Sequence, residues 1–436
     1  MKILRSGRAE FDAEISELRQ RRLSMLDQYR EDVDREITAY RKDREKFLLK
    51  CLREFDEIEI KESGLWIDPS AIKNSHKLVS SELRKSLETV KERIERYHSE
   101  MKLTSMQTQE DQGILWSTQV RPLDRVGIYV PGGKAHYFMS LLIAGVAARV
   151  AGVKEILVAS SPKKKFEPIY VDPLLLYTCK LLKIDRLLIS GGPQALAALA
   201  FGTESQAPVQ KLVGSGGFRT MTGLQRLNSY VDVEGVYGPS ETAFVCDSSA
   251  SVDFVAADIV ARSDRDAMAS SLVFHSDEKW LRNLVDRLAQ SAGGIKDGAS
   301  RDCVQKSLES STRFFLVKTP SEAIDYCNQI APGALCLHLK SPQDYVSDVR
   351  ACGALFLGSY SPPTAIDITG GATGLEATLG SAESHRSLSP AAFCRRFASI
   401  EITREALEMA QKPSVLLSES EGYVCHDESF RARLLQ

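Results

Sequence analysis

The sequence lacks the features that mark several classes of protein. Its nine cysteines are scattered and form no CxxC pair, so we expect reduced thiols and no cysteine-based metal site. The longest apolar run, residues 138–153, contains Arg149 and is shorter than the ~20 residues of a membrane-spanning helix. The net charge is −2 and no basic stripe stands out, which argues against nucleic acid as a partner. Residues 8–62 are dense in charge, so no signal peptide is visible and we expect a cytoplasmic protein with no membrane partner.

The chain has 436 residues, of which 43% are hydrophobic, and this suffices for more than one compact core. Residues 8–62 and 69–103 have apolar residues near helical spacing. From Arg125 onward, short β-rich runs alternate with helical segments, which predicts an α/β fold with parallel sheets and two α/β layers. Helices are expected after the glycine-rich stretch 370–380. The predicted strands are Val126–Val130, Glu155–Ser160 and Arg186–Ser190, followed by Thr242–Cys246, Ser271–Phe274, Arg313–Val317 and Leu355–Leu357.

The first predicted strand runs into Pro131-Gly132-Gly133 and then into a long helix. Glycines let a backbone approach a ligand closely, and a helix N-terminus favours a phosphate group, so this turn is a candidate cofactor site. The alternative is a tight turn without a ligand, which a double glycine after a strand also indicates.

Four longer motifs stand out in the chain. They are RPLDRVGIYVPGG at 121–133, GGPQALAALAFGTE at 191–204, GPSE at 238–241 and DFVAAD at 253–258. Taken together, they resemble the histidinol dehydrogenases, zinc enzymes that oxidise an amino alcohol to an acid in two NAD-linked steps. The resemblance implies two incomplete Rossmann-like lobes, helical arms at both ends and an intertwined homodimer. The domains expected from it are an N-terminal arm at 1–26, a first α/β domain at 27–128 and 241–388, a second, on the cofactor side, at 129–240, and a C-terminal arm at 389–436.

The family's proton-transferring pair is replaced in this chain. The family pattern N-x-x-A-P-E-H-L-E-L aligns with residues 328–337, where Gly333 and Ala334 stand at the Glu and His positions. Neither side chain can move a proton, so the catalytic residues are unknown. His136, His338 and Lys340 are the alternative acid–base candidates that the sequence offers.

The cofactor positions are partly kept. Tyr129 and Gln194 match two residues that contact NAD in the family, whereas Gly217 stands where the family has an asparagine. The resemblance therefore implies NAD as cofactor, with weakened binding.

The metal positions are largely lost. The family's four zinc ligands correspond to Arg262, Arg265, Asp367 and His426. A guanidinium group has no lone pair to offer, so zinc is not expected. Substrate-binding positions of the family correspond to Ser240 and Glu421, and those of a loop Asn and His to Thr373 and Gly374. The candidate substrate-binding set is therefore Ser240, Arg262, Arg265, Asp367, Glu421 and His426.

Arg262 and Arg265 are three residues apart and so share a helix face. Two interpretations remain open: a buried cluster of salt bridges, or a pocket that receives an anionic ligand. In the first case, at least one arginine should reach Asp367, or Glu421 of the partner subunit.

Two functions are considered from these replacements. The first is a zinc-independent, NAD-linked oxidoreductase that acts on a CH–OH or aldehyde group of a small polar or anionic substrate other than histidinol. The alternative is a catalytically silent member that serves as a binding or scaffold protein. NAD titration together with metal analysis would discriminate between them, and both predict that histidinol is not oxidised.

Overall fold

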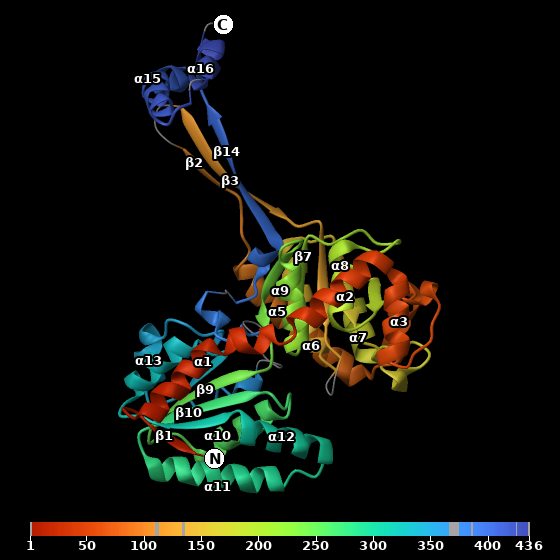
Figure 1. Ribbon diagram of the computed structural model, residues 1–436, viewed down its shortest axis with the longest axis vertical. Coiled ribbons are helices and arrows are strands. Elements are labelled where there is room, and N and C mark those ends of the chain that lie inside the picture. The colour runs from red at the N-terminus through yellow and green to blue at the C-terminus, as the bar shows by residue number, and fades with distance from the viewer. Residues whose placement is uncertain are drawn as a thin grey trace. The chain divides into compact units, whose positions relative to one another are not determined.

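The computed structural model of the chain describes residues 2–109, 113–132, 136–365, 375–384, 387–423 and 425–434. The chain divides into two compact units. The larger unit comprises Met1–Met101 and Leu123–Phe393, and the smaller one comprises Lys102–Pro122 and Cys394–Gln436. The larger unit contains two parallel sheets with helices packed on them, and the smaller unit contains an antiparallel sheet (Figure 1). The chain is thus mixed α/β with parallel sheets, as predicted.

A six-stranded parallel sheet forms one half of the larger unit. Side chains alternate between its faces, as the two-residue period of a strand requires. In the strand 241–246, Ala243 and Val245 belong to one buried cluster, and Phe244 and Cys246 belong to another. The strands, in spatial order, are β1 (Ile3–Arg5), β11 (Thr312–Leu316), β10 (Ser270–His275), β9 (Glu241–Cys246), β12 (Ala334–His338) and β13 (Ala354–Leu357).

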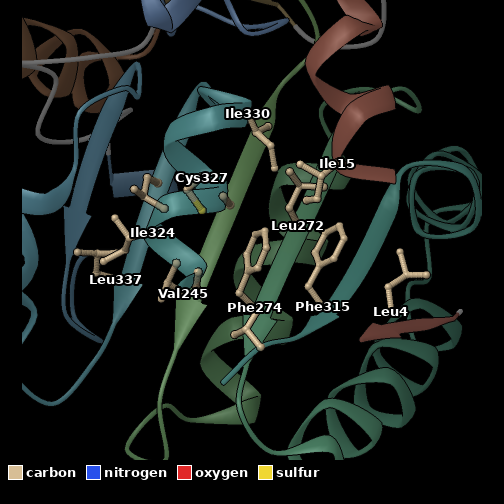
Figure 2. Packing of buried hydrophobic residues seen from close by; sticks show 14 of the residues in the cluster. Leu4, Ile15, Val245, Leu272, Phe274, Phe315, Ile324, Cys327, Ile330 and Leu337 are labelled. Atoms are coloured by element: carbon tan, nitrogen blue, oxygen red, sulfur yellow. The ribbon is translucent and has the colours of Figure 1, made fainter. Parts of the chain in front are cut away.

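Helices cover both faces of this sheet. α1 (Ala9–Asp27) and α13 (Pro320–Ile330) cover the face of Val245, where Phe274 and Phe315 stack with ring centroids 4.7 Å apart (Figure 2). The opposite face is covered by α10 (Val252–Ser263), α11 (Glu278–Gly293) and α12 (Gly298–Ser310). Burial on both faces explains why these strands read as nearly continuous apolar runs in the sequence.

A five-stranded parallel sheet forms the other half of the larger unit. Chain order and spatial order differ at one place: β4 lies between β5 and β7, so the strand order reverses there. Ligands of open parallel sheets bind at such a reversal, outside the carboxyl ends of the strands. The strands, in spatial order, are β6 (Arg186–Ile189), β5 (Glu155–Ser160), β4 (Arg125–Val130), β7 (Lys211–Ser215) and β8 (Asp232–Tyr237).

The remaining helices of the larger unit pack around the five-stranded sheet or connect to it. Several begin with a side-chain cap: Asp172 accepts a hydrogen bond from the Leu174 N–H at 2.7 Å. They are α2 (Arg30–Asp43), α3 (Glu45–Phe55), α4 (Pro69–Asn74), α5 (Ser81–Glu100), α6 (Phe138–Ala151), α7 (Pro173–Leu181), α8 (Gly192–Phe201) and α9 (Phe218–Leu227).

The smaller unit differs from the helical expectation. β14 (Cys394–Ile402) pairs antiparallel with β3 (Ile114–Pro122), which also pairs with β2 (Met106–Gln109). The expectation of helix over 389–436 is therefore wrong for β14 and right for α15 (Arg404–Ser420) and α16 (His426–Leu434). β14 escapes detection because most of its side chains are exposed, so its apolar pattern does not follow a single buried face. Among the described residues, no helix is long and apolar enough to cross a membrane.

Candidate functional site

A cavity of about 390 Å³ lies in the larger unit, at the carboxyl ends of β4, β7 and β8. It therefore lies where the strand order reverses, and α10 of the other sheet supplies part of its wall. Its polar groups are hydroxyls, guanidiniums, carboxylates and one thiol. They belong to Tyr137, Ser140, Ser215, Tyr237, Ser240, Arg262, Arg265, Asp266, Cys303, Glu376 and Thr378.

Arg262 is the most constrained of these side chains. It is only 1% exposed, and its Nε donates to Thr242 Oγ1 at 3.0 Å. Its two terminal nitrogens both contact the carboxylate of Glu376, which is itself 7% exposed. The guanidinium is therefore held by three contacts and serves as a fixed, compensated charge on the cavity wall. This supports the salt-bridge interpretation, with Glu376 as the carboxylate.

Burial perturbs two groups near this pair. The pKa of Asp258, one turn before Arg262 on α10, is raised to about 6 by burial, although the arginine cation opposes the shift. His338 Nε2 lies 3.7 Å from Asp258 Oδ2, and burial lowers the pKa of this histidine to about 4. His338 is 1% exposed and does not line the cavity, and Lys340 is an exposed residue beyond β12. Neither of these two acid–base candidates is therefore placed to act in the cavity.

The segment 375–384 closes one side of the cavity, and several hydrogen bonds anchor it, among them one from the Thr378 N–H to the Val236 carbonyl at 2.9 Å. Glu241 accepts from the Leu379 N–H at 2.7 Å and forms a buried bidentate pair with Arg21 of α1, at 2.7 and 2.9 Å. Thr378 Oγ1 accepts from the Gly238 N–H at 2.8 Å. These contacts hold Glu376 against Arg262. Because Arg21 holds Glu241, this wall of the cavity depends on a residue of α1, near the N-terminus.

The predicted cofactor residues lie at the carboxyl edge of the five-stranded sheet. Tyr129 is 3% exposed, and its hydroxyl accepts a hydrogen bond from the Gly192 N–H at 3.0 Å. Gln194 is 7% exposed in the first turn of α8. Gly217 lines the cavity as the N-cap of α9, and a Cβ atom there would meet nothing within 4 Å. Tyr129 and Gln194 do not line the cavity, so the open space lies beside the N-terminus of α9 alone. A helix N-terminus with open space beside it suits a phosphate-bearing cofactor.

The family's Glu-His positions lie elsewhere. Gly333 and Ala334 are buried at the start of β12 and do not line the cavity. A Cβ at Gly333 would lie 3.1 Å from Thr378 Cγ2 and 3.2 Å from the Glu241 carbonyl oxygen. The space for a longer side chain is thus taken by the segment 375–384.

The other predicted site residues are placed as follows. Ser240, Arg262, Arg265 and Gly217 line the same cavity. Glu421 and His426 are exposed residues of the smaller unit. Asp367, Thr373 and Gly374 lie outside the described residues.

Comparisons with known proteins agree with the resemblance. The family model for histidinol dehydrogenase matches residues 19–434. The chain belongs to the histidinol dehydrogenase family. The histidinol dehydrogenase of Wolinella succinogenes is 32% identical over all of this chain and 99% of its own length. That of Clostridium acetobutylicum is 31% identical over 89% of this chain and 88% of its own. The fold is shared with the crystal structure of histidinol dehydrogenase from Elizabethkingia anophelis, at a TM-score of 0.85 and 24% identity over 93% of this chain and 92% of that one.

These relatives correct two expectations. Full-length relatives are named histidinol dehydrogenase, which contradicts both the zinc-independent oxidoreductase on another substrate and the silent scaffold protein. The expectation of weakened NAD binding without zinc is contradicted as well, because histidinol dehydrogenases are NAD-dependent and zinc-binding. The replacements at several family positions together predicted a changed or lost activity, and the full-length matches to histidinol dehydrogenases overturn that prediction.

The described residues nevertheless do not offer a zinc site. They contain no group of three or more His, Cys, Asp or Glu side chains that could hold a metal ion. Arg262 and Arg265 have no lone pair, and Arg262 is already engaged by Glu376. We therefore assign no chemical step to a metal.

Sequence reasoning missed Glu376 and Cys303. Two arginines on one helix face predicted a carboxylate partner, and the residues proposed for it were Asp367 and Glu421. In the structure the partner of Arg262 is Glu376. Glu376 lies within the glycine-rich stretch 370–380, and nothing in its local pattern indicates that it is buried.

Proposed function

We propose that this protein catalyses the NAD-linked oxidation of histidinol, the reaction for which its relatives are named. The observation that carries the proposal is the family match over 19–434 combined with a cavity at the strand-order reversal. In this proposal NAD accepts the hydride removed from the substrate. The open N-cap at Gly217 and the first turn of α8 hold the dinucleotide.

The chain's own residues divide the remaining tasks. Ser240 offers a hydroxyl to the polar substrate, and Arg265 lends the cavity a positive charge that favours an anionic product. Arg262, locked by Glu376, keeps the wall of α10 in place. Gly333 and Ala334 contribute no proton transfer, so an acid–base group must come from another part of the chain.

We further propose the finer architecture that the resemblance implies. Each parallel sheet belongs to a Rossmann-like lobe. The lobe of the five-stranded sheet begins before β4 (Arg125–Val130) and not at residue 129, because residue 129 lies inside that strand. The protein is an intertwined cytoplasmic homodimer. The smaller unit supports the dimer, because several large apolar side chains are exposed there. They are Trp116, Phe397, Ile400, Ile402, Leu416 and Leu417. A monomer by light scattering at micromolar concentration would contradict this assembly.

A direct assay tests the function. Purified protein is mixed with histidinol and NAD⁺, with zinc added, and NADH is followed by absorbance while the metal content is measured. Turnover is expected, and Ser240→Ala should raise KM several-fold through the loss of one hydrogen bond. Ser249→Ala, an exposed serine in a turn, is the matched control. No NADH formation under these conditions would overturn the proposal.

A further inference from the structure

A second cavity, of about 650 Å³, adjoins the first. The two share Tyr137, Ser140 and Arg265 as lining residues, so they meet at the beginning of α6 and the end of α10. His136 lines this second cavity and not the first, and the next residue, Tyr137, lines both. The imidazole therefore lies in the second cavity, one residue before the place where the two spaces meet, with 38% of its side chain exposed.

A buried carboxylate fixes the orientation of this imidazole. The Nδ1 atom of His136 contacts Asp172 Oδ2, and the Asp172 side chain is only 7% exposed. The other oxygen of Asp172 caps α7 by accepting from the Leu174 N–H at 2.7 Å. The two oxygens thus have separate tasks, and the helix cap prevents the carboxylate from turning away from the ring. Such a carboxylate holds Nδ1 protonated and leaves Nε2 as the free base.

The backbone beside His136 is also unusual. Tyr137 has φ 46°, in the left-handed region, where an aromatic residue is uncommon. Strained residues persist where the surrounding structure holds them, and they gather at functional sites. Here the strained residue lines both cavities and precedes α6 directly.

We propose that His136, oriented by Asp172, is the acid–base residue of the oxidation. The inference rests on the proposed function and supplies the group that Gly333 and Ala334 do not. As the substrate carbon loses a hydride to NAD⁺, the hydroxyl proton passes to Nε2 of His136 and the C–O bond becomes a carbonyl. The products are the aldehyde, NADH and an imidazolium, which releases its proton to water. The hydrated aldehyde loses a hydride and a proton in the same manner to give the acid.

The charged groups near this dyad are consistent with the assignment. Arg265 lines the second cavity. Burial and the charge of Lys165 lower the pKa of Lys163, and the Asp172 carboxylate opposes this shift. Phe166 is a neighbour of the imidazole, with ring centroids 6.3 Å apart and ring planes tilted by 52°. The Nδ1 atom of His136 contacts Asp172, so Nε2 is the nitrogen assigned to proton transfer.

The experiment compares three variants of the full-length protein. His136→Ala removes the base, Asp172→Asn removes the charge while keeping an N-cap residue, and His76→Ala removes a histidine outside both cavities. We expect kcat of His136→Ala to fall by roughly 10²–10⁴-fold with NAD affinity unchanged by calorimetry, and added imidazole to restore part of it. Asp172→Asn should lower kcat less, and ¹⁵N NMR should show that the His136 tautomer is no longer fixed. His76→Ala should behave like the wild type.

The outcomes separate the two proposals. A wild-type protein that does not oxidise histidinol overturns the proposed function and, with it, the role of His136. An active wild type whose His136→Ala variant keeps its kcat overturns the role of His136 alone. A loss of kcat that imidazole does not restore, together with a loss of NAD affinity, would show a purely structural histidine and would also overturn it.

Discussion

Arg262 and Glu376 form a buried ion pair on the cavity wall, between α10 and the segment 375–384. Thr242 Oγ1 accepts the remaining Nε hydrogen at 3.0 Å, so both ions are compensated by the protein itself. The pair joins two segments separated by more than a hundred residues in sequence, and it therefore depends on the tertiary fold.

The first prediction concerns the coupling in this pair. Arg262→Met leaves the Glu376 carboxylate buried without its partner, so we expect a loss of roughly 3–5 kcal/mol in the free energy of unfolding. The double variant Arg262→Met with Glu376→Leu should lose much less, because both charges are removed together. Urea denaturation of the single and double variants measures the coupling. The control is Lys50→Ala on α3, whose exposed partner Glu54 lies 3.8 Å away, and it should change little. Additive losses would contradict the coupling.

The second prediction concerns pH. Burial raises the pKa of Asp258 to about 6 from 3.8, so between these values the folded protein holds a proton that the unfolded chain releases. The contribution of Asp258 to stability therefore falls as the pH rises through this window. Asp258→Asn removes the effect, and its stability relative to the wild type should increase by roughly 2–3 kcal/mol from pH 4 to pH 7.

His338 acts in the opposite direction, because burial lowers its pKa to about 4 and stability is lost as the pH falls towards that value. His338 lies 3.7 Å from Asp258, so the double variant Asp258→Asn with His338→Gln is compared with His338→Gln alone to separate the two groups. Asp253→Asn, on the exposed first turn of the same helix, controls for the introduction of an amide into α10. A difference between Asp258→Asn and wild type that stays constant with pH would contradict the prediction.

The third prediction concerns a close approach between α6 and the end of α7. A Cβ at Gly145 would lie 2.5 Å from Leu182 Cδ1, so Gly145→Ala should cost about 1–3 kcal/mol through overpacking. Gly293→Ala, at the end of α11, meets nothing within 4 Å and should stabilise the protein by about 0.4–1 kcal/mol through a less flexible unfolded chain. Thermal unfolding of the wild type and the two variants should show a lower melting temperature for Gly145→Ala and a higher one for Gly293→Ala. Equal melting temperatures would show that Leu182 moves aside without cost.

The sequence predicted some parts of this molecule better than others. β5 and β9 were found because buried parallel strands carry unbroken apolar runs, and local composition alone reveals them. β14 was missed because its exposed side chains carry no such signal. Ser240 and Arg262 were identified as site residues through family motifs, because a matched motif assigns each of its residues to a known position of the family's site. Glu376 was not found, because its burial depends on the anchoring of 375–384 by Glu241, which no local pattern encodes.

The last prediction concerns the cofactor. Gly217 begins α9 at the cavity, has extended backbone with φ −68° and ψ 173°, and leaves open space where a side chain would project. Asparagine suits this backbone as a helix cap and is the residue that the family resemblance places there. Gly217→Asn should therefore tighten NAD binding by about 2–10-fold, the effect of one added hydrogen bond. Calorimetric titration with NAD⁺ measures the change, with Gly217→Ala as the control that adds bulk without an amide. Because the cap also stabilises α9, unfolding is measured in parallel, and a gain in stability without a gain in affinity would place the cofactor away from this helix.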